Sequence, residues 1–95
     1  MKFVKLVFTG HAIKRMFERY ISPEEVRVVL TEGEIAETYE EDEPWPSRLV
    51  VGRAGNRILH VVAAIEPVSG ICHVITTYEP DRESWTPDLK ARRKR

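Results

Sequence analysis

The sequence predicts an α+β domain in which a helical hairpin packs on one face of a mostly antiparallel sheet of four to five strands. Three observations favour this fold class. The chain has 95 residues, which suits one domain. Apolar residues recur at helical spacing through residues 10–33, and they alternate with polar residues through much of residues 34–78. Turn-forming residues separate these runs, so the helices precede most of the strands.

A first helix is expected directly after residues 1–8, which are predicted to form a first strand or an extended arm. Thr9 can act as its N-cap, because a threonine hydroxyl can accept a hydrogen bond from a free N–H of the first turn. Four apolar residues follow at i, i+3, i+4 and i+7, namely Ile13, Met16, Phe17 and Tyr20. We expect this stripe to be buried in the core.

A second helix is expected from Ser22, which is followed by Pro23 and, three positions on, by Glu25. This order predicts an N-cap, a proline in the first turn and a capping box. The expected buried stripe is Val26, Val29 and Leu30. Gly33 is expected to end the helix with a positive φ.

Four further strands are expected, at residues 34–39, 48–53, 57–65 and 71–78. An acidic loop spans residues 40–47, and the last two strand pairs are joined by Ala54-Gly55-Asn56 and by a turn at residues 66–70. Proline and aspartate argue against regular structure from Glu79 onward. We therefore predict one domain at residues 1–85 and a basic tail at 86–95, frayed over residues 90–95.

Pairing the strands symmetrically about their loops assigns the side chains to two faces of the sheet. The face expected beneath the helices carries Leu49, Val51, Leu59, Val61, Ala63, Ile65, Ile71 and Ile75. The other face is expected to carry Arg48, Val50, Gly52, Ile58, His60, Val62, Cys72, Val74, Thr76 and Tyr78. In this register His60 lies between Val50 and Thr76. An error of one residue would reverse these assignments.

The formal net charge is zero, from 15 Lys plus Arg and 15 Asp plus Glu, but the charges are segregated along the chain. Residues 32–47 carry seven acidic and no basic groups, whereas residues 86–95 carry five basic groups and one acidic group. A neutral total therefore does not exclude a polyanionic ligand. The longest apolar run, residues 61–65, is far shorter than the roughly 20 residues of a membrane helix. With one cysteine and no signal peptide, the chain is expected to be cytoplasmic.

Two groups of side chains could act on a phosphodiester. His60 and Tyr78 share a sheet face with Arg48, and the alternative is that His60 is a structural histidine with Arg48 and Tyr78 at the rim. His11, Arg15 and Arg19 recur every four residues along the first helix and could hold phosphate. Alternatively, they form a solvated face with Glu18 as counter-ion.

The other reactive or large side chains support fewer functions. His11, His60, His73 and Cys72 lack the spacing of a metal site, so we expect no metal and no cofactor, with Cys72 as a core residue. Trp45 and Trp85 can each cap the core, anchor a partner or stack on a base. The acidic residues 40–43 are expected to be solvated.

Several separated motifs resemble one bacterial family, the domain of unknown function 4258. They are HAIKRMFER at residues 11–19, ISPEEV at 21–26, LHVV at 59–62 and TYEPD at 77–81 with Trp85. That family looks related to the RelE- and BrnT-like toxins of type II toxin–antitoxin modules, which are small α+β ribonucleases. The resemblance implies a RelE-like fold and places His11, Arg15, His60, Tyr78 and Glu79 within the motifs.

On this basis we expect a toxin-like, metal-independent endoribonuclease, resembling an mRNA interferase, in which the ribose 2′-hydroxyl attacks the adjacent phosphate. The expected catalytic residues are His60, His11, Arg15, Tyr78 and Glu79. The expected nucleic-acid-binding residues are Arg19, Arg48, Lys90, Arg92 and Arg93. Expected partners are RNA and a small antitoxin, with a homodimer as a further option and no membrane. The alternative is a non-catalytic protein-binding module of a toxin–antitoxin-type complex.

Overall fold

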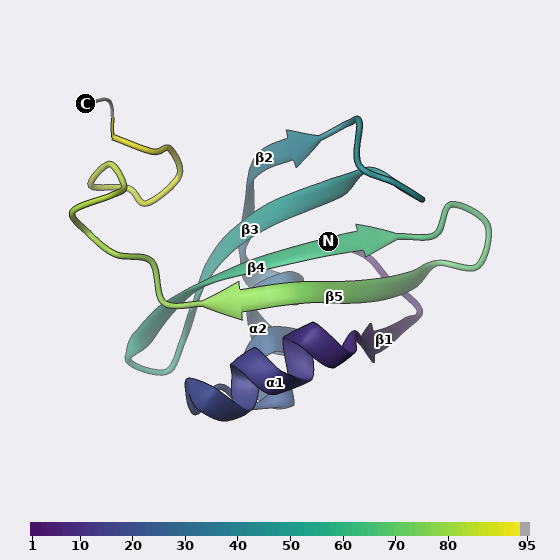
Figure 1. The fold of residues 1–95 in the computed structure, drawn as a ribbon, viewed down its shortest axis with the longest axis horizontal. Helices are drawn as coiled ribbons and strands as arrows, with labels where there is room; N and C mark the ends of the chain where they lie inside the picture. The colour runs from purple at the N-terminus through teal and green to yellow at the C-terminus, as the bar shows by residue number, and fades with distance from the viewer. Residues whose placement is uncertain (94–95) are drawn as a thin grey trace.

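The computed structural model describes residues 1–93 and confirms the α+β class (Figure 1). Its elements, in chain order, are β1 (Lys5–Phe8), α1 (Gly10–Glu18), α2 (Pro23–Glu32), β2 (Glu34–Tyr39), β3 (Ser47–Ala54), β4 (Arg57–Ile65) and β5 (Ile71–Tyr78). The strands form one sheet in the order β1-β5-β4-β3-β2. The sheet is mixed, because β1 is parallel to β5 whereas the other neighbours are antiparallel.

Both helices cover the same face of this sheet and begin where the sequence predicts. The Thr9 hydroxyl accepts a hydrogen bond from the Ala12 N–H at 3.1 Å. Ser22 and Glu25 form a reciprocal capping box, with N–H to oxygen distances of 3.1 and 2.9 Å. α1 packs on β5, and α2 packs on β3 and β4. We name this side of the sheet the helix face.

The expected burial of the α1 stripe is wrong for three of its four residues. Ile13, Phe17 and Tyr20 are 58%, 86% and 88% exposed. The helix instead buries Ala12 and Met16, which also lie one turn apart. Two sets of apolar residues in this segment have helical spacing, the predicted stripe and the pair of Ala12 and Met16. Spacing shows that the members of a set share a side of the helix, but it does not show which set is buried. The small Ala12 side chain allows α1 to approach β5 closely, which turns the larger residues outward.

Gly33 ends α2 as expected, but its predicted positive φ is wrong. Its φ is −79°, an extended conformation open to any residue. Glycine is required there for space, because a Cβ atom would lie 2.5 Å from the carbonyl oxygens of both Val29 and Val51. The end of α2 thus lies directly against β3.

The β3–β4 turn contains two residues and not three, which reverses part of the predicted face assignment. Ala54 pairs with Arg57, and Gly55 has a φ of +62°. The register therefore shifts by one residue, and every β3 side chain changes face. Arg48, Val50 and Gly52 lie on the helix face, whereas Leu49 and Val51 lie on the other face.

The β4–β5 pairing corrects a second part of the assignment. Near the turn, Cys72 and Val74 pack in the helix-face core, so Ile71 points to the opposite side. A bulge at Ile75 on β5, opposite Val62 and Ala63, then restores the predicted side for Thr76 and Tyr78. His60 consequently lies between Val51 and Tyr78 and not between Val50 and Thr76.

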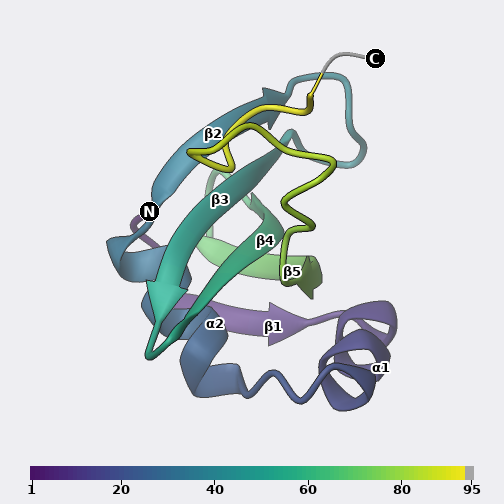
Figure 2. The same cartoon turned by 90° about the vertical axis from the view of Figure 1, so that its left-hand side faces the viewer.

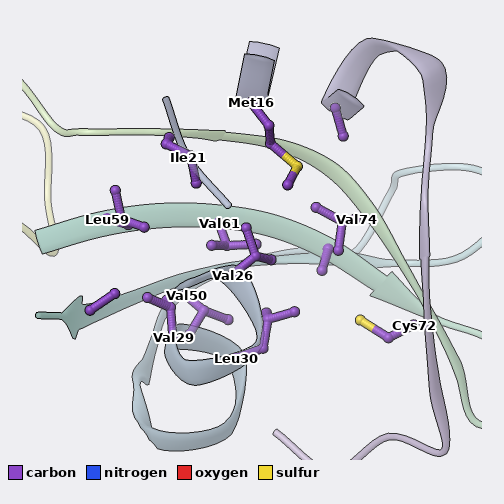
Figure 3. Packing of buried hydrophobic residues seen from close by; sticks show 13 residues of the cluster. Met16, Ile21, Val26, Val29, Leu30, Val50, Leu59, Val61, Cys72 and Val74 are labelled. Carbon is purple, nitrogen blue, oxygen red and sulfur yellow. The ribbon is translucent and has the colours of Figure 1, made fainter. Parts of the chain in front are cut away.

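The main core lies on the helix face (Figure 3). There the α2 residues Val26, Val29 and Leu30 pack against β3 and β4. As predicted, these three side chains are buried. Cys72 is fully buried in the same core, so its thiol is a core group, and burial raises its pKa to about 11.

A smaller core lies on the other side of the sheet, beneath the C-terminal strap, which we define as residues 80–93. Trp85 and Leu89 from the strap are 4% and 2% exposed and pack on Leu49 and Val51. Figure 2 shows the strap on the side of β3 opposite α2. We name this side of the sheet the strap face.

Backbone hydrogen bonds hold the strap in an irregular loop. The Thr86 N–H donates to the Ala91 carbonyl, and the Arg93 N–H donates to the Ser84 carbonyl, each at 2.8 Å. A frayed tail from residue 90 is therefore wrong for residues 90–93, while 94 and 95 lie outside the described residues. The strap lacks helix or strand spans, as its proline and aspartate content predicts.

Candidate functional site

A cavity of about 510 Å³ lies where the strap meets the end of β5. Its walls come from three parts of the chain: the end of α1, the end of β5 and the strap. The lining residues are Arg19, Tyr78, Glu79, Asp81, Ser84, Trp85 and Arg92. Four of them, Arg19, Tyr78, Glu79 and Arg92, are sequence-predicted site residues. We name this cavity the strap pocket.

Two arginines reach the strap pocket from opposite sides. Arg19 follows the last residue of α1, and its guanidinium donates a hydrogen bond to the Thr77 carbonyl at 2.9 Å. The Arg92 guanidinium lies over the Trp85 ring, 4.7 Å from its centre. That geometry is a cation–π contact, which orients Arg92 without neutralising its charge. The pocket therefore holds two oriented cations.

His60 lies directly behind Tyr78 and is fully buried. Its Nε2 is 2.6 Å from the Leu89 carbonyl oxygen, and its Nδ1 is 3.3 Å from the Tyr78 hydroxyl. Because a carbonyl only accepts, the neutral imidazole carries its proton on Nε2, and Tyr78 donates to Nδ1. The Trp85 ring packs edge-on against the imidazole at 4.4 Å.

Burial controls the ionisation of both members of this pair. It lowers the pKa of His60, against the opposing effect of the Leu89 carbonyl, and the positive charge of Arg92 lowers it further. Burial also raises the pKa of Tyr78, which Arg92 partly offsets. The imidazole is thus held neutral, and the phenol is held protonated at neutral pH.

Arg57 connects the elements around the strap pocket, a role that was not predicted from the sequence. Its guanidinium pairs with Glu25 at 2.8 Å and with Glu79 at 3.1 Å. It also donates to the backbone carbonyls of Arg19 and Tyr20, at 3.3 and 2.6 Å. One side chain therefore joins the α1–α2 link to the end of β5. These partners are distant in sequence, so no local pattern reveals them.

The remaining predicted site residues lie elsewhere. His11 is exposed at the start of α1, and Arg15 pairs with Glu18 at 2.9 Å. Arg48 lies on the helix face, beside a separate cavity with Met1 and Ile65. In the strap, Lys90 pairs with Glu34, and Arg93 donates to the Arg82 carbonyl. None of these five lines the strap pocket.

Trp45 and His73 form a separate pair on the strap face. Their rings stack with centres 5.0 Å apart, and His73 Nε2 lies 2.8 Å from Glu66. Trp85 caps the smaller core, as one of the sequence alternatives proposed. Within residues 1–93, no three His, Cys, Asp or Glu side chains are grouped to hold a metal ion, and no helix is long and apolar enough to span a membrane.

Comparison with protein families gives one match. The family model for a domain of unknown function, DUF4258, matches residues 8–79, well over half of the chain. The chain belongs to the DUF4258 family. No curated protein and no solved structure matches the chain.

The family match divides the strap pocket into two parts. Arg19, Tyr78 and Glu79 lie within the matched DUF4258 residues, as does His60. Asp81, Ser84, Trp85 and Arg92 lie beyond them. The matched DUF4258 residues and the strap therefore each supply part of the pocket lining.

Proposed function

We propose that this DUF4258 domain is an endoribonuclease of the RelE- and BrnT-like toxin group, and that the strap pocket is its active site. One observation carries the proposal: two oriented arginines, a protonated phenol and a carboxylate line the same cavity. These are the groups that phosphodiester cleavage requires, because charge develops on the phosphate while one proton leaves and another arrives.

The reaction assigns each group one role. The Glu79 carboxylate accepts the proton of the ribose 2′-hydroxyl, and that oxygen attacks the adjacent phosphorus. The bond from phosphorus to the 5′-oxygen breaks, and the Tyr78 hydroxyl donates its proton to that oxygen. The products are a 2′,3′-cyclic phosphate and a free 5′-hydroxyl. Arg19 and Arg92 hold the phosphate oxygens.

This scheme changes the role expected for His60. A buried imidazole whose Nε2–H donates to Leu89 has no access to a substrate in this conformation. Its Nδ1 instead accepts the Tyr78 hydrogen bond in the free protein and so positions the phenol, whose hydroxyl turns to the 5′-oxygen during the reaction. His60 is therefore a positioning residue in the proposal. His11, Arg15 and Arg48 have no role in it, because they lie outside the pocket.

The test uses purified full-length protein and a fluorescently labelled single-stranded RNA in EDTA. We expect cleavage of RNA, no cleavage of the 2′-O-methyl or DNA version, and a 2′,3′-cyclic phosphate detected by mass spectrometry. Tyr78→Phe removes only the hydroxyl and should slow cleavage by roughly 10²–10⁴-fold. The Arg48→Gln variant, which is altered on the helix face, should cleave the RNA at the wild-type rate. Intact RNA with the wild-type protein, or full activity in Tyr78→Phe, would refute the proposal.

A second candidate function is a protein-binding module of a toxin–antitoxin-type complex. The exposed α1 stripe of Ile13, Phe17 and Tyr20 favours it, since large apolar side chains grouped on a surface are typical of protein contacts. Inducible expression separates the two functions. The ribonuclease should arrest growth and degrade RNA, and Tyr78→Phe should relieve both effects. A binding module should leave cellular RNA intact.

A further inference from the structure

We infer that a second cavity, next to the strap pocket, binds the phosphate group that neighbours the scissile one, so that the ligand is an extended single strand of RNA. This inference rests on the proposed function. The second cavity has a volume of about 170 Å³ and lies between the β3–β4 turn and the strap. Glu79 lines both cavities, so they adjoin at the end of β5.

Three arginines line the second cavity: Arg53 from β3, Arg57 from β4 and Arg82 from the strap. Arg57 is already committed to Glu25 and Glu79. Neither Arg53 nor Arg82 forms an ion pair with a carboxylate within residues 1–93, and both are exposed. Two guanidiniums without a carboxylate partner among the described residues therefore line one small polar cavity.

The acidic groups of the two cavities each already have a partner. Glu79 pairs with Arg57. The Asp81 carboxylate accepts hydrogen bonds from the Glu83 N–H at 2.8 Å and the Ser84 hydroxyl at 3.2 Å, within its own turn. Five arginines thus line the two cavities against two carboxylates, each of which already has a partner. This excess of positive charge suits a ligand with more than one phosphate.

A nucleic-acid backbone fits these features better than a mononucleotide. Guanidinium groups bind phosphate oxygens through paired hydrogen bonds, and successive phosphates along a strand can occupy adjoining sites. Asn56, at the tip of the β3–β4 turn, adds an exposed amide beside the arginines. Arg53 and Arg82 therefore act in binding and not in the chemical step.

The experiment measures binding of a uniformly 2′-O-methylated RNA octamer, which cannot be cleaved, by fluorescence anisotropy at several salt concentrations. For a single strand, the logarithm of the binding constant falls with the logarithm of salt concentration by about 0.7 per phosphate contact. Arg53→Gln and Arg82→Gln should each reduce this slope, and the double variant, which loses the contact to this phosphate, should reduce it by about 0.7. A 2′-O-methylated dinucleotide, with one phosphate, should bind all variants equally.

Arg48→Gln is the matched control, because it removes an exposed arginine from the opposite face of the sheet. Its slope should equal that of the wild-type protein, and circular dichroism should show every variant folded. Unchanged slopes in Arg53→Gln and Arg82→Gln would overturn the inference. So would competition by a polyglutamate peptide as strong as that by RNA. Altered slopes without cleavage of unmodified RNA would retain the phosphate site and refute only the proposed chemistry.

Discussion

The two faces of the sheet are covered in different ways. On the helix face, α1 and α2 satisfy their own backbone hydrogen bonds and contribute mainly apolar side chains. On the strap face, residues 80–93 form an irregular loop that contributes two large apolar side chains, Trp85 and Leu89. Polar groups accumulate around that loop, and the strap pocket opens at its edge. An irregular cover leaves room for a polar cavity that a well-packed helix would fill.

One matched pair of substitutions measures this difference, and we expect the largest effect on the helix face. Leu30 and Leu89 are both leucines, 0% and 2% exposed, on opposite sides of the sheet. Leu30→Ala should lower the free energy of unfolding by about 2–5 kcal/mol, because it leaves a cavity between α2 and the sheet. Leu89→Ala should cost roughly 2 kcal/mol, since the strap can close around the smaller side chain.

Urea unfolding measures the change in the free energy of unfolding for each variant. Native-state hydrogen exchange shows which segments each substitution destabilises. Leu89→Ala should accelerate exchange of the strap amides of Thr86, Leu89 and Arg93 more than that of the β4 amides. Leu30→Ala should accelerate both groups. Equal acceleration of the strap and β4 by both substitutions would show that the two covers unfold as one unit.

A smaller effect is expected in the pH dependence of the free energy of unfolding. Burial lowers the pKa of His60 in the folded protein, so the unfolded chain binds more protons between that pKa and about 6.5. The free energy of unfolding should therefore fall as the pH drops through 6.5, and level off below the folded-state pKa. His60→Gln retains an N–H donor for the Leu89 carbonyl and should lose this part of the pH dependence. Urea titrations at pH 7.5, 6.5 and 5.5 test it, and parallel curves for the two proteins would contradict it.

The smallest effect is expected at the outward side of α1. Phe17 is 86% exposed, so Phe17→Ser should change the free energy of unfolding by less than about 0.5 kcal/mol. The neighbouring residue Met16 is 5% exposed, and Met16→Ala should cost about 2–5 kcal/mol. Thermal unfolding of both variants checks the orientation of the helix. A large loss in Phe17→Ser would mean that this side of α1 is covered in solution.

The features that the sequence predicted correctly depend on residues close together in the chain. The Thr9 cap and the Ser22 capping box each involve atoms only three residues apart. The buried side of α2 also followed from spacing. Face assignment in the sheet required the length of one turn, and counting Ala54 as a turn residue was enough to reverse β3.

The candidate site was predictable only in part, because several of its residues are far apart in the sequence. Tyr78 and Glu79 are adjacent in sequence, so one motif indicated both. Arg19 and Arg92 reach the same cavity from opposite ends of the chain, and their meeting depends on how the strap folds back. Arg48 was assigned to the wrong face by the register error. The burial of His60 beneath Trp85 and Leu89 is a tertiary effect that no local pattern indicated.

Because the thiol of Cys72 is buried, a cysteine introduced into the strap can be labelled selectively. This residue is the one cysteine in the sequence, it is fully buried, and its pKa is raised to about 11. The thiolate is the species that attacks maleimides and similar reagents, and it is scarce at such a site near neutral pH. A cysteine introduced into the strap, for example Ser84→Cys, would therefore react almost alone. A dye or spin label there would report the position of the strap without removal of the native cysteine.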